Sequence, residues 1–191
     1  MSKEKIYIFD TTLRDGAQTQ GVDFSLNDKE KIATALDNLG VDYIEGGWPG
    51  ANPTDTEFFQ KKINFNNSKL TAFGMTKRTG RSAENDPGLS ALLNSKAPSI
   101  CLVGKSWDFH VDVVLGISNE ENLENIKEST KHFVKEKKEF MFDAEHFFDG
   151  YKNNSNYALS CIKTAYDNGA RWIVLCDTNG GTFPQEVSKI V

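Results

Sequence analysis

The sequence predicts an α/β fold, a (β/α)8 barrel of which about the first six strand-helix units lie within the chain. Short apolar runs alternate with stretches of helical periodicity six times along 191 residues, and at about 32 residues a unit, eight units would need about 255, a usual barrel length. An open doubly wound sheet would show the same alternation. The length per unit and a final segment without a helix-ending signal favour the barrel.

Six apolar runs are the predicted strands. Because a helical pattern separates each run from the next, the connections are crossovers, and crossovers join parallel strands. The sequence therefore predicts a parallel sheet built from residues 6–9, 41–44, 70–73, 99–103, 140–142 and 172–176.

Capping signals place the first helix between Ser25 and Gly40. Ser25 is followed three residues later by Asp28, which is typical of a capping box, and a glycine commonly ends a helix. We expect apolar side chains to form the inward face and charged ones the exposed face, the inward set being Ile32, Leu36 and Leu39 and the exposed set Lys29, Glu30 and Asp37.

Similar signals predict the later helices. Asn52-Pro53, Asp86-Pro87 and Ser118 each combine a capping side chain or a first-turn proline with a following helical pattern. The last apolar stripe, over residues 187–191, has no capping residue after it. We therefore expect residues 1–191 to be one partial barrel domain that breaks off in a sixth helix, before the seventh strand.

Composition points to a cytoplasmic protein that acts on small molecules. The net charge of −5 provides no basic surface for nucleic acid, and the apolar run near the N-terminus is too short for a signal sequence or a membrane span. The three cysteines are widely spaced, without a Cys-x-x-Cys pair, so neither a disulfide framework nor a thiolate zinc site is indicated.

Charged and polar side chains follow most of the predicted strands. In a barrel the chemistry lies at the carboxyl ends of the strands, where so many buried charges would be costly unless they pair with one another or with a metal ion. We therefore interpret the following residues as one constellation: Arg14, Asp15, Glu45, Lys105, Glu145, His146, Asp177, Thr178 and Asn179.

Arg14 and Asp15 carry the most specific signal in this set. They end the first apolar run, and Gly16 turns the chain directly after them. An aspartate can bind a divalent cation through oxygen, and an arginine supplies a permanent positive charge for a developing oxyanion. A solvated ion pair in a turn is the alternative.

Two further segments allow a functional and a structural interpretation. Alternation places Asp143 and Glu145 on one strand face, and a glutamate in apolar surroundings can serve as an acid or base, although an edge strand at the surface would look similar. Residues 176–181 could form a simple turn, or a turn that presents Thr178 to a carboxylate ligand. There is no His-x-His, so a complete metal site cannot be written from this sequence.

Residues 9–18, Phe-Asp-Thr-Thr-Leu-Arg-Asp-Gly-Ala-Gln, resemble the signature of the DRE-type metallolyase barrels. This family includes the 2-isopropylmalate, homocitrate and citramalate synthases and hydroxymethylglutaryl-CoA lyase. Residues 45–54, 104–111 and 142–152 resemble most the long-form citramalate synthases. Ala17, where the isopropylmalate synthases usually have Glu, favours the same group.

The resemblance implies a role for each matching residue. Asp15 would bind a divalent metal ion (Mg, Mn or Zn), Arg14 would bind the α-keto acid and stabilise the alkoxide, and Glu145 would be the catalytic carboxylate. Gln18 and Thr178 would contribute to substrate binding, Thr178 at the carboxylate of the keto acid. The implied reaction is a Claisen-type condensation of acetyl-CoA with pyruvate to citramalate, in isoleucine biosynthesis, by a homodimer when full length.

One departure from the family limits this implication. The two histidine ligands and an asparagine ligand of the family would fall beyond Val191, so the resemblance leaves this chain with one metal ligand and predicts that it is inactive alone. Other functions remain open: a 2-isopropylmalate synthase or a lyase, a Schiff-base aldolase that uses Lys105, or a small-molecule binding module without catalysis.

Overall fold

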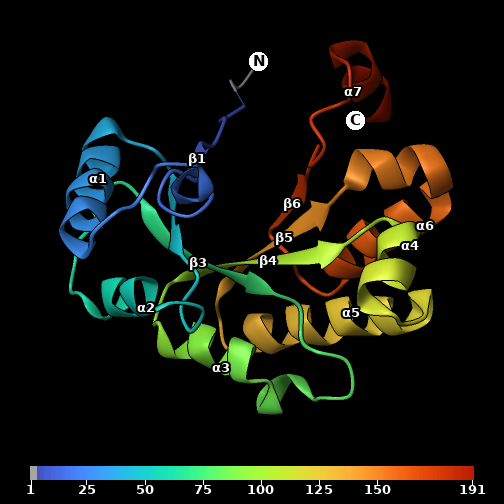
Figure 1. The fold of residues 1–191 in the computed structure, drawn as a ribbon, viewed down its shortest axis with the longest axis horizontal. Coiled ribbons are helices and arrows are strands. Elements are labelled where there is room, and N and C mark those ends of the chain that lie inside the picture. Colours follow the sequence, from blue (N-terminus) through green and yellow to red (C-terminus); the bar gives the residue numbers. More distant parts are fainter. Residues whose placement is uncertain (1–3) are drawn as a thin grey trace. The chain divides into compact units, whose positions relative to one another are not determined.

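The computed structural model describes residues 4–191, which form two compact units. Unit 1 comprises residues up to Gly74 together with Ala91–Ile100, and unit 2 comprises Met75–Ser90 together with Cys101–Val191. Strands and helices alternate along both, as Figure 1 shows. Among residues 4–191, no helix is long and apolar enough to cross a membrane.

Unit 1 holds three parallel strands: β1 (Phe9–Asp10), β2 (Tyr43–Gly47) and most of β3 (Lys69–Met75). The first strand is shorter than predicted, and Ile6 is 86% exposed. Phe9 is in register with Tyr43, the first residue of β2, and the Ile8 carbonyl before it accepts the Asp42 and Tyr43 N–H groups at 3.0 Å.

Local capping forms the helices of unit 1 where the sequence predicts them. The Ser25 side chain accepts the Asp28 N–H, and the Asp28 carboxylate accepts the Ser25 N–H at 3.1 Å, which begins α1 (Leu26–Leu39). Gly40 ends α1 with φ +88°, a conformation that favours glycine. Asn52 caps α2 (Pro53–Gln60), and a short 3-10 helix, η1 (Gly16–Gln18), follows β1.

The predicted faces of α1 are partly wrong. Lys29 and Asp37 are buried, and Leu39 is 77% exposed. Lys29 is ion-paired with Asp55, whereas the Asp37 carboxylate accepts the backbone N–H groups of residues 66, 67 and 68 at 2.8–2.9 Å. Burial alone would raise the pKa of Asp37, but these three hydrogen bonds outweigh burial and lower it.

Unit 2 continues the alternation of strands and helices. The chain passes between the units within β3, within α3 (Pro87–Asn94) and within β4 (Ser99–Lys105). The other elements of unit 2 are η2 (Ala83–Asn85), α4 (Asp108–His110), η3 (Val111–Leu115), α5 (Asn119–Lys135), β5 (Glu139–Glu145), α6 (Phe147–Asp167), β6 (Trp172–Leu175) and α7 (Pro184–Ile190).

The core of unit 2 lies between its strands and helices α5 and α6. β5 and β6 pair in parallel from Met141 and Trp172 onward, and α6 packs on both strands (Figure 1). The buried side chains there are apolar and mostly aromatic: Ile126, Phe133, Phe140, Phe142, Phe147, Ala158 and Cys161. α6 is interrupted at Asn154, whose side-chain amide donates to the Asp108 carboxylate at 2.7 Å.

Three strands extend beyond the apolar runs that predicted them. Glu45 lies within β2, Lys105 is the last residue of β4, and Glu145 is the last residue of β5. These three charged side chains therefore stand on strand backbone, Glu45 directly before a register shift between β2 and β3. This fixes their direction more firmly than a loop would.

Candidate active site

In unit 1, the Arg14 guanidinium lies between two carboxylates. Its Nε donates to Glu45 Oε2 at 2.6 Å, and its Nη1 lies 3.2 Å from Asp15 Oδ1. The guanidinium carbon stands 3.9 Å from the centre of the Phe73 ring. An ion pair, a hydrogen bond and a cation–π contact thus fix this side chain, which is what a pre-organised positive charge requires.

Glu45 and Asp15 differ in exposure. The Glu45 side chain is fully buried, so its charge requires the Arg14 contact as compensation. The Asp15 side chain is 64% exposed, and a carboxylate in this position offers oxygen to a cation from solvent. Gln18 lies in the same turn, with an exposed side chain and its backbone N–H bonded to the Asp15 carbonyl at 2.9 Å.

A buried ion pair anchors the segment that follows Glu45. Lys29 is paired with Asp55 and donates to the Gly46 carbonyl at 2.8 Å, while Asp55 Oδ2 accepts the Trp48 N–H at 2.8 Å. Gly47, with φ +141°, lies against this carboxylate, and a Cβ there would stand 2.6 and 2.7 Å from the two Asp55 oxygens. The end of β2 is therefore held by contacts that have no room for a side chain at position 47.

In unit 2, Glu145 is ion-paired with Lys105, the last residue of β4. The Glu145 carbonyl accepts both the Ser106 N–H at 3.2 Å and the Ser106 hydroxyl at 2.7 Å. The predicted partner on the same face, Asp143, is buried and accepts the Cys101 thiol at 3.1 Å. Of these two carboxylates, Glu145 is the more exposed one, with 26% of its side chain accessible.

The segment after β6 forms the turn that its sequence allowed. The Asp177 carboxylate accepts the Thr182 N–H at 3.0 Å and the Thr182 hydroxyl at 2.8 Å, which closes a turn over residues 177–182. Thr178 remains exposed, and its hydroxyl oxygen accepts the His146 N–H at 2.9 Å. Backbone geometry thus links Thr178 to the residue directly after Glu145.

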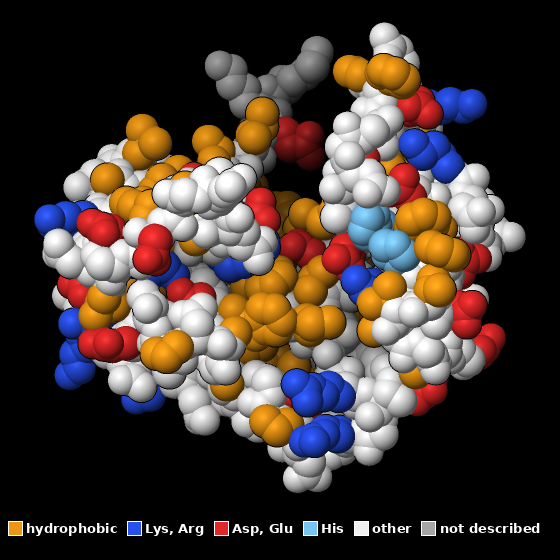
Figure 2. All heavy atoms as spheres, viewed as in Figure 1, with side chains coloured by type: hydrophobic (Ala, Val, Ile, Leu, Met, Phe, Trp, Pro, Cys, Tyr) orange, Lys and Arg blue, Asp and Glu red, His pale blue; other side chains and the backbone are white. Residues whose placement is uncertain are grey.

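A histidine pair lies beside Glu145, and sequence reasoning left it without a role. The rings of His110 and His146 meet edge-on with centroids 4.4 Å apart, and the centroid of the Trp107 ring lies 4.8 Å from that of His110. Figure 2 shows histidine side chains side by side at the surface, next to acidic and basic groups. Burial, then the neighbouring His146 and Lys105, lower the pKa of His110. The Trp-Asp-Phe-His run at 107–110 was the available signal.

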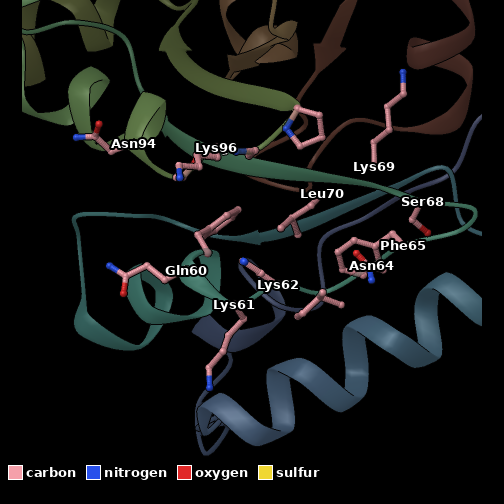
Figure 3. Close-up of a pocket in the computed structure, with 15 residues that line it drawn as sticks. Gln60, Lys61, Lys62, Asn64, Phe65, Ser68, Lys69, Leu70, Asn94 and Lys96 are labelled. Atoms are coloured by element: carbon pink, nitrogen blue, oxygen red, sulfur yellow. Dashed lines mark hydrogen bonds between the residues drawn. The ribbon is translucent and has the colours of Figure 1, made fainter.

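Unit 1 also holds a cavity of about 640 Å³, and none of the predicted site residues lines it. It is bounded by residues 59–65, 68–70 and 94–98, where β3 begins. In Figure 3 the Lys61 side chain points toward α1, where Lys61 pairs with Glu30 at 3.3 Å. The Lys69 side chain points in the opposite direction, away from α1. Its lysines do not converge on one point, so the cavity is not the candidate site.

The structure thus brings the predicted site residues together in two groups. Arg14, Asp15 and Gln18 share one turn of unit 1, with Glu45 as a partner that the ligand assignments had omitted. Glu145 and Thr178 lie in unit 2, joined through His146. The roles assigned to these residues remain predictions.

Comparison with known proteins gives consistent relatives. The chain is 53% identical to the (R)-citramalate synthase of Aquifex aeolicus over 98% of its own length and 36% of that protein. It is 32% identical to the 2-isopropylmalate synthase of Staphylococcus carnosus over 97% of its length and 35% of that protein. The chain therefore spans about a third of the length of the curated relatives it matches.

Solved structures establish the fold. The HMG-CoA lyase of Bacillus subtilis superposes with a TM-score of 0.79 at 18% identity, over 97% of this chain and 62% of that one. An Acinetobacter baumannii HMG-CoA lyase, solved in complex with coenzyme A and 3-methylmalate, gives 0.75 at 17% identity, over 96% and 60%. The predicted partial (β/α)8 barrel is confirmed. The HMGL-like family matches residues 5–191, and the chain therefore belongs to that family.

Proposed function

We propose that this chain supplies the N-terminal part of the catalytic barrel of a citramalate synthase, an acyltransferase that condenses acetyl-CoA with pyruvate. The observation that carries the proposal is the Arg14 guanidinium, fixed by buried Glu45 and adjacent to exposed Asp15. The relatives support the substrate pair, because the citramalate synthases share 44–53% identity with this chain and the 2-isopropylmalate synthases 32–33%.

Arg14 would bind the keto acid and stabilise the charge that develops on its ketone oxygen. A guanidinium carries five N–H donors in a fixed plane, and Nε is used to hold the group against Glu45. Because the group is already oriented, little reorganisation accompanies the reaction. Removing one such oriented donor typically costs about 10²–10³ in rate.

The HMGL-like enzymes depend on a divalent metal ion, and the residues of unit 1 fit one. Asp15 offers a carboxylate in an exposed turn beside the keto-acid arginine, and hard cations such as Mg²⁺ or Mn²⁺ take carboxylate oxygen, as Zn²⁺ also does. When bound, the ion would polarise the ketone of the substrate. The other ligands of the family would come from positions beyond residue 191.

Glu145 would remove a proton from the methyl group of acetyl-CoA. Lys105 holds its carboxylate, and Ser106 holds its backbone carbonyl, so the side chain projects from a fixed point at the end of β5. The carbanion would attack the keto carbon, and the ketone oxygen would take up a proton to become the hydroxyl of citramalyl-CoA. Water would then cleave the thioester to give citramalate and CoA. An ammonium paired with this carboxylate is not a ready nucleophile, which disfavours a Schiff-base role for Lys105.

The remaining expectations complete the proposal. Thr178 would contact the carboxylate of pyruvate, and Gln18 would contribute to the same site. The enzyme would act in the cytoplasm as a homodimer, in isoleucine biosynthesis. A 2-isopropylmalate synthase is the second candidate, and it would prefer a branched keto acid to pyruvate.

A thiol-release assay tests the proposal in the full-length gene product. With a divalent metal ion, acetyl-CoA and pyruvate should release CoA faster than acetyl-CoA with a branched keto acid. Arg14→Gln and Asp15→Asn should each lower kcat/KM by at least about 10²-fold, and Arg81→Gln, an exposed arginine of a loop, should leave it unchanged. Equal rates in R14Q and R81Q would refute the proposal, and a preference for the branched keto acid would favour the second candidate.

A further inference from the structure

His146 has an unusual backbone conformation. Within residues 4–191, three non-glycine residues have positive φ: Lys96, Lys137 and His146. Lys96 and Lys137 follow the ends of α3 and α5, where a left-handed residue commonly terminates a helix. His146, with φ +55° and ψ +34°, instead precedes α6. Helix termination does not explain it, and such outliers gather at functional sites.

The conformation directs two successive N–H groups toward the end of β6. The His146 N–H reaches the Thr178 hydroxyl oxygen at 2.9 Å, and the Phe147 N–H reaches the Cys176 carbonyl at 3.1 Å. The φ and ψ angles of His146 set the direction of the Phe147 N–H relative to the His146 N–H, so the left-handed conformation lets both groups reach the same loop. The turn between β5 and α6 therefore holds the β6 loop through main-chain contacts.

The His146 side chain makes a second connection to the same loop. Its Nδ1 lies 3.2 Å from Asp149 Oδ2, which also accepts the Asn179 side-chain amide at 2.9 Å. Because a carboxylate only accepts, the ring donates from Nδ1. The ring itself is packed against His110 and Trp107, with centroids 4.4 and 5.8 Å away.

The two connections end on adjacent residues, Thr178 and Asn179. A threonine hydroxyl has one hydrogen, and its oxygen already accepts from His146, so that hydrogen is left for a different oxygen. We propose that His146, with Asp149, is a positioning residue that fixes Thr178 so that its hydroxyl donates to the carboxylate of the keto acid. This inference rests on the proposed function, in which Thr178 binds that carboxylate.

A purely structural role for His146 predicts a different result. If His146 only began α6, its loss would lower stability and change both substrates alike. A positioning role instead predicts a selective effect on the keto acid. Glycine at position 146 separates these roles, because it adopts positive φ readily and removes only the ring.

The test compares steady-state constants in the full-length gene product. His146→Gly and Asp149→Ala should each raise KM for the keto acid about tenfold, the factor expected for one misplaced hydrogen bond to a charged group, with KM for acetyl-CoA changed less than twofold. Lys137→Gly is the matched control, since it relieves the same backbone conformation at an exposed helix end. It should leave both constants unchanged.

Variants of Thr178 separate failure of this inference from failure of the proposed function. Thr178→Val should raise KM for the keto acid at least as much as H146G and D149A do. Thr178→Ser, which keeps a hydroxyl, should leave this KM near that of the unmodified enzyme. If T178V raises this KM while H146G and D149A match the unmodified enzyme, the positioning role is wrong and the binding role stands. If T178V has no effect, the binding role of Thr178 is wrong. A parallel change in both KM values in H146G, or unfolding of H146G with unchanged constants in D149A, would also overturn the positioning role.

Discussion

Replacing Lys29 by methionine is expected to destabilise the protein by about 3–5 kcal/mol, the usual consequence of leaving one partner of a buried ion pair without the other. Lys29 is 3% exposed, and it bridges the Asp55 carboxylate and the Gly46 carbonyl. Methionine fills a similar volume but supplies no donor. The variant therefore leaves a buried carboxylate whose remaining hydrogen bonds come from Trp48 and Asn52.

The magnitude is large relative to total stability. Single domains unfold with about 5–15 kcal/mol, so the loss would remove a substantial part of it. Adding Asp55→Asn to Lys29→Met removes the uncompensated charge while an amide can still accept the Trp48 N–H. The double variant should therefore recover at least about 1 kcal/mol relative to Lys29→Met, a coupling of the size usual for residues in contact.

Urea denaturation of the full-length gene product, followed by tryptophan fluorescence, measures these free energies of unfolding. Lys31→Met is the matched control, because Lys31 lies two residues away on the same helix with an exposed side chain. It should change stability by no more than about 0.5 kcal/mol. Equal unfolding free energies for K29M and K31M, or a double variant no more stable than K29M, would refute the reasoning.

Three further predictions concern unit 2. Gly150→Ala should lower stability by about 1–2 kcal/mol, since a Cβ there would overlap the Ser106 carbonyl oxygen and stand 3.0 Å from Trp107 Cα, and helix propensity offsets only part of this overpacking. Gly181→Ala, with open space around the position, should not lower stability, and equal melting temperatures of the two variants would contradict this. Burial alone would raise the pKa of the Asp86 carboxyl, but hydrogen bonds from backbone N–H groups outweigh burial and lower this pKa. The stabilisation that Asp86 provides is therefore present at neutral pH and is lost as the pH falls below the ordinary pKa of 3.8. Asp86→Asn should reduce the melting temperature most at neutral pH, which a melting series from pH 7 to 3 checks. Burial raises the pKa of the Cys161 thiol to about 12, so at pH 8 iodoacetamide should modify half-buried Cys176 well before Cys161, as peptide mass spectrometry can follow.

Features set by neighbouring residues could be predicted from the sequence. Ser25, Asn52 and Ser118 each cap a helix at the predicted place, because the capping hydrogen bond reaches only three residues along the chain. Arg14 and Asp15 share a turn as expected, since Gly16 follows them directly. Such signals are complete within a short window of sequence.

Features set by distant residues could not be predicted in the same way. Lys29 looked like part of an exposed face because its partner, Asp55, is 26 residues away. The same holds for Glu45, which meets Arg14 across 31 residues, and for His146, whose backbone is held by Thr178 across 32. A pattern within one helix or strand carries no information on these pairs.

The close approach of Gly47 and Asp55 limits the order in which this region can change during evolution. A side chain at position 47 would overlap the Asp55 carboxylate, and the positive φ of Gly47 adds a second barrier. Replacing Asp55 first would leave the Lys29 charge buried without its partner. Accepted substitutions at positions 29, 47 and 55 should therefore occur together, and a lineage that keeps Lys29 and Asp55 should also keep a glycine at 47.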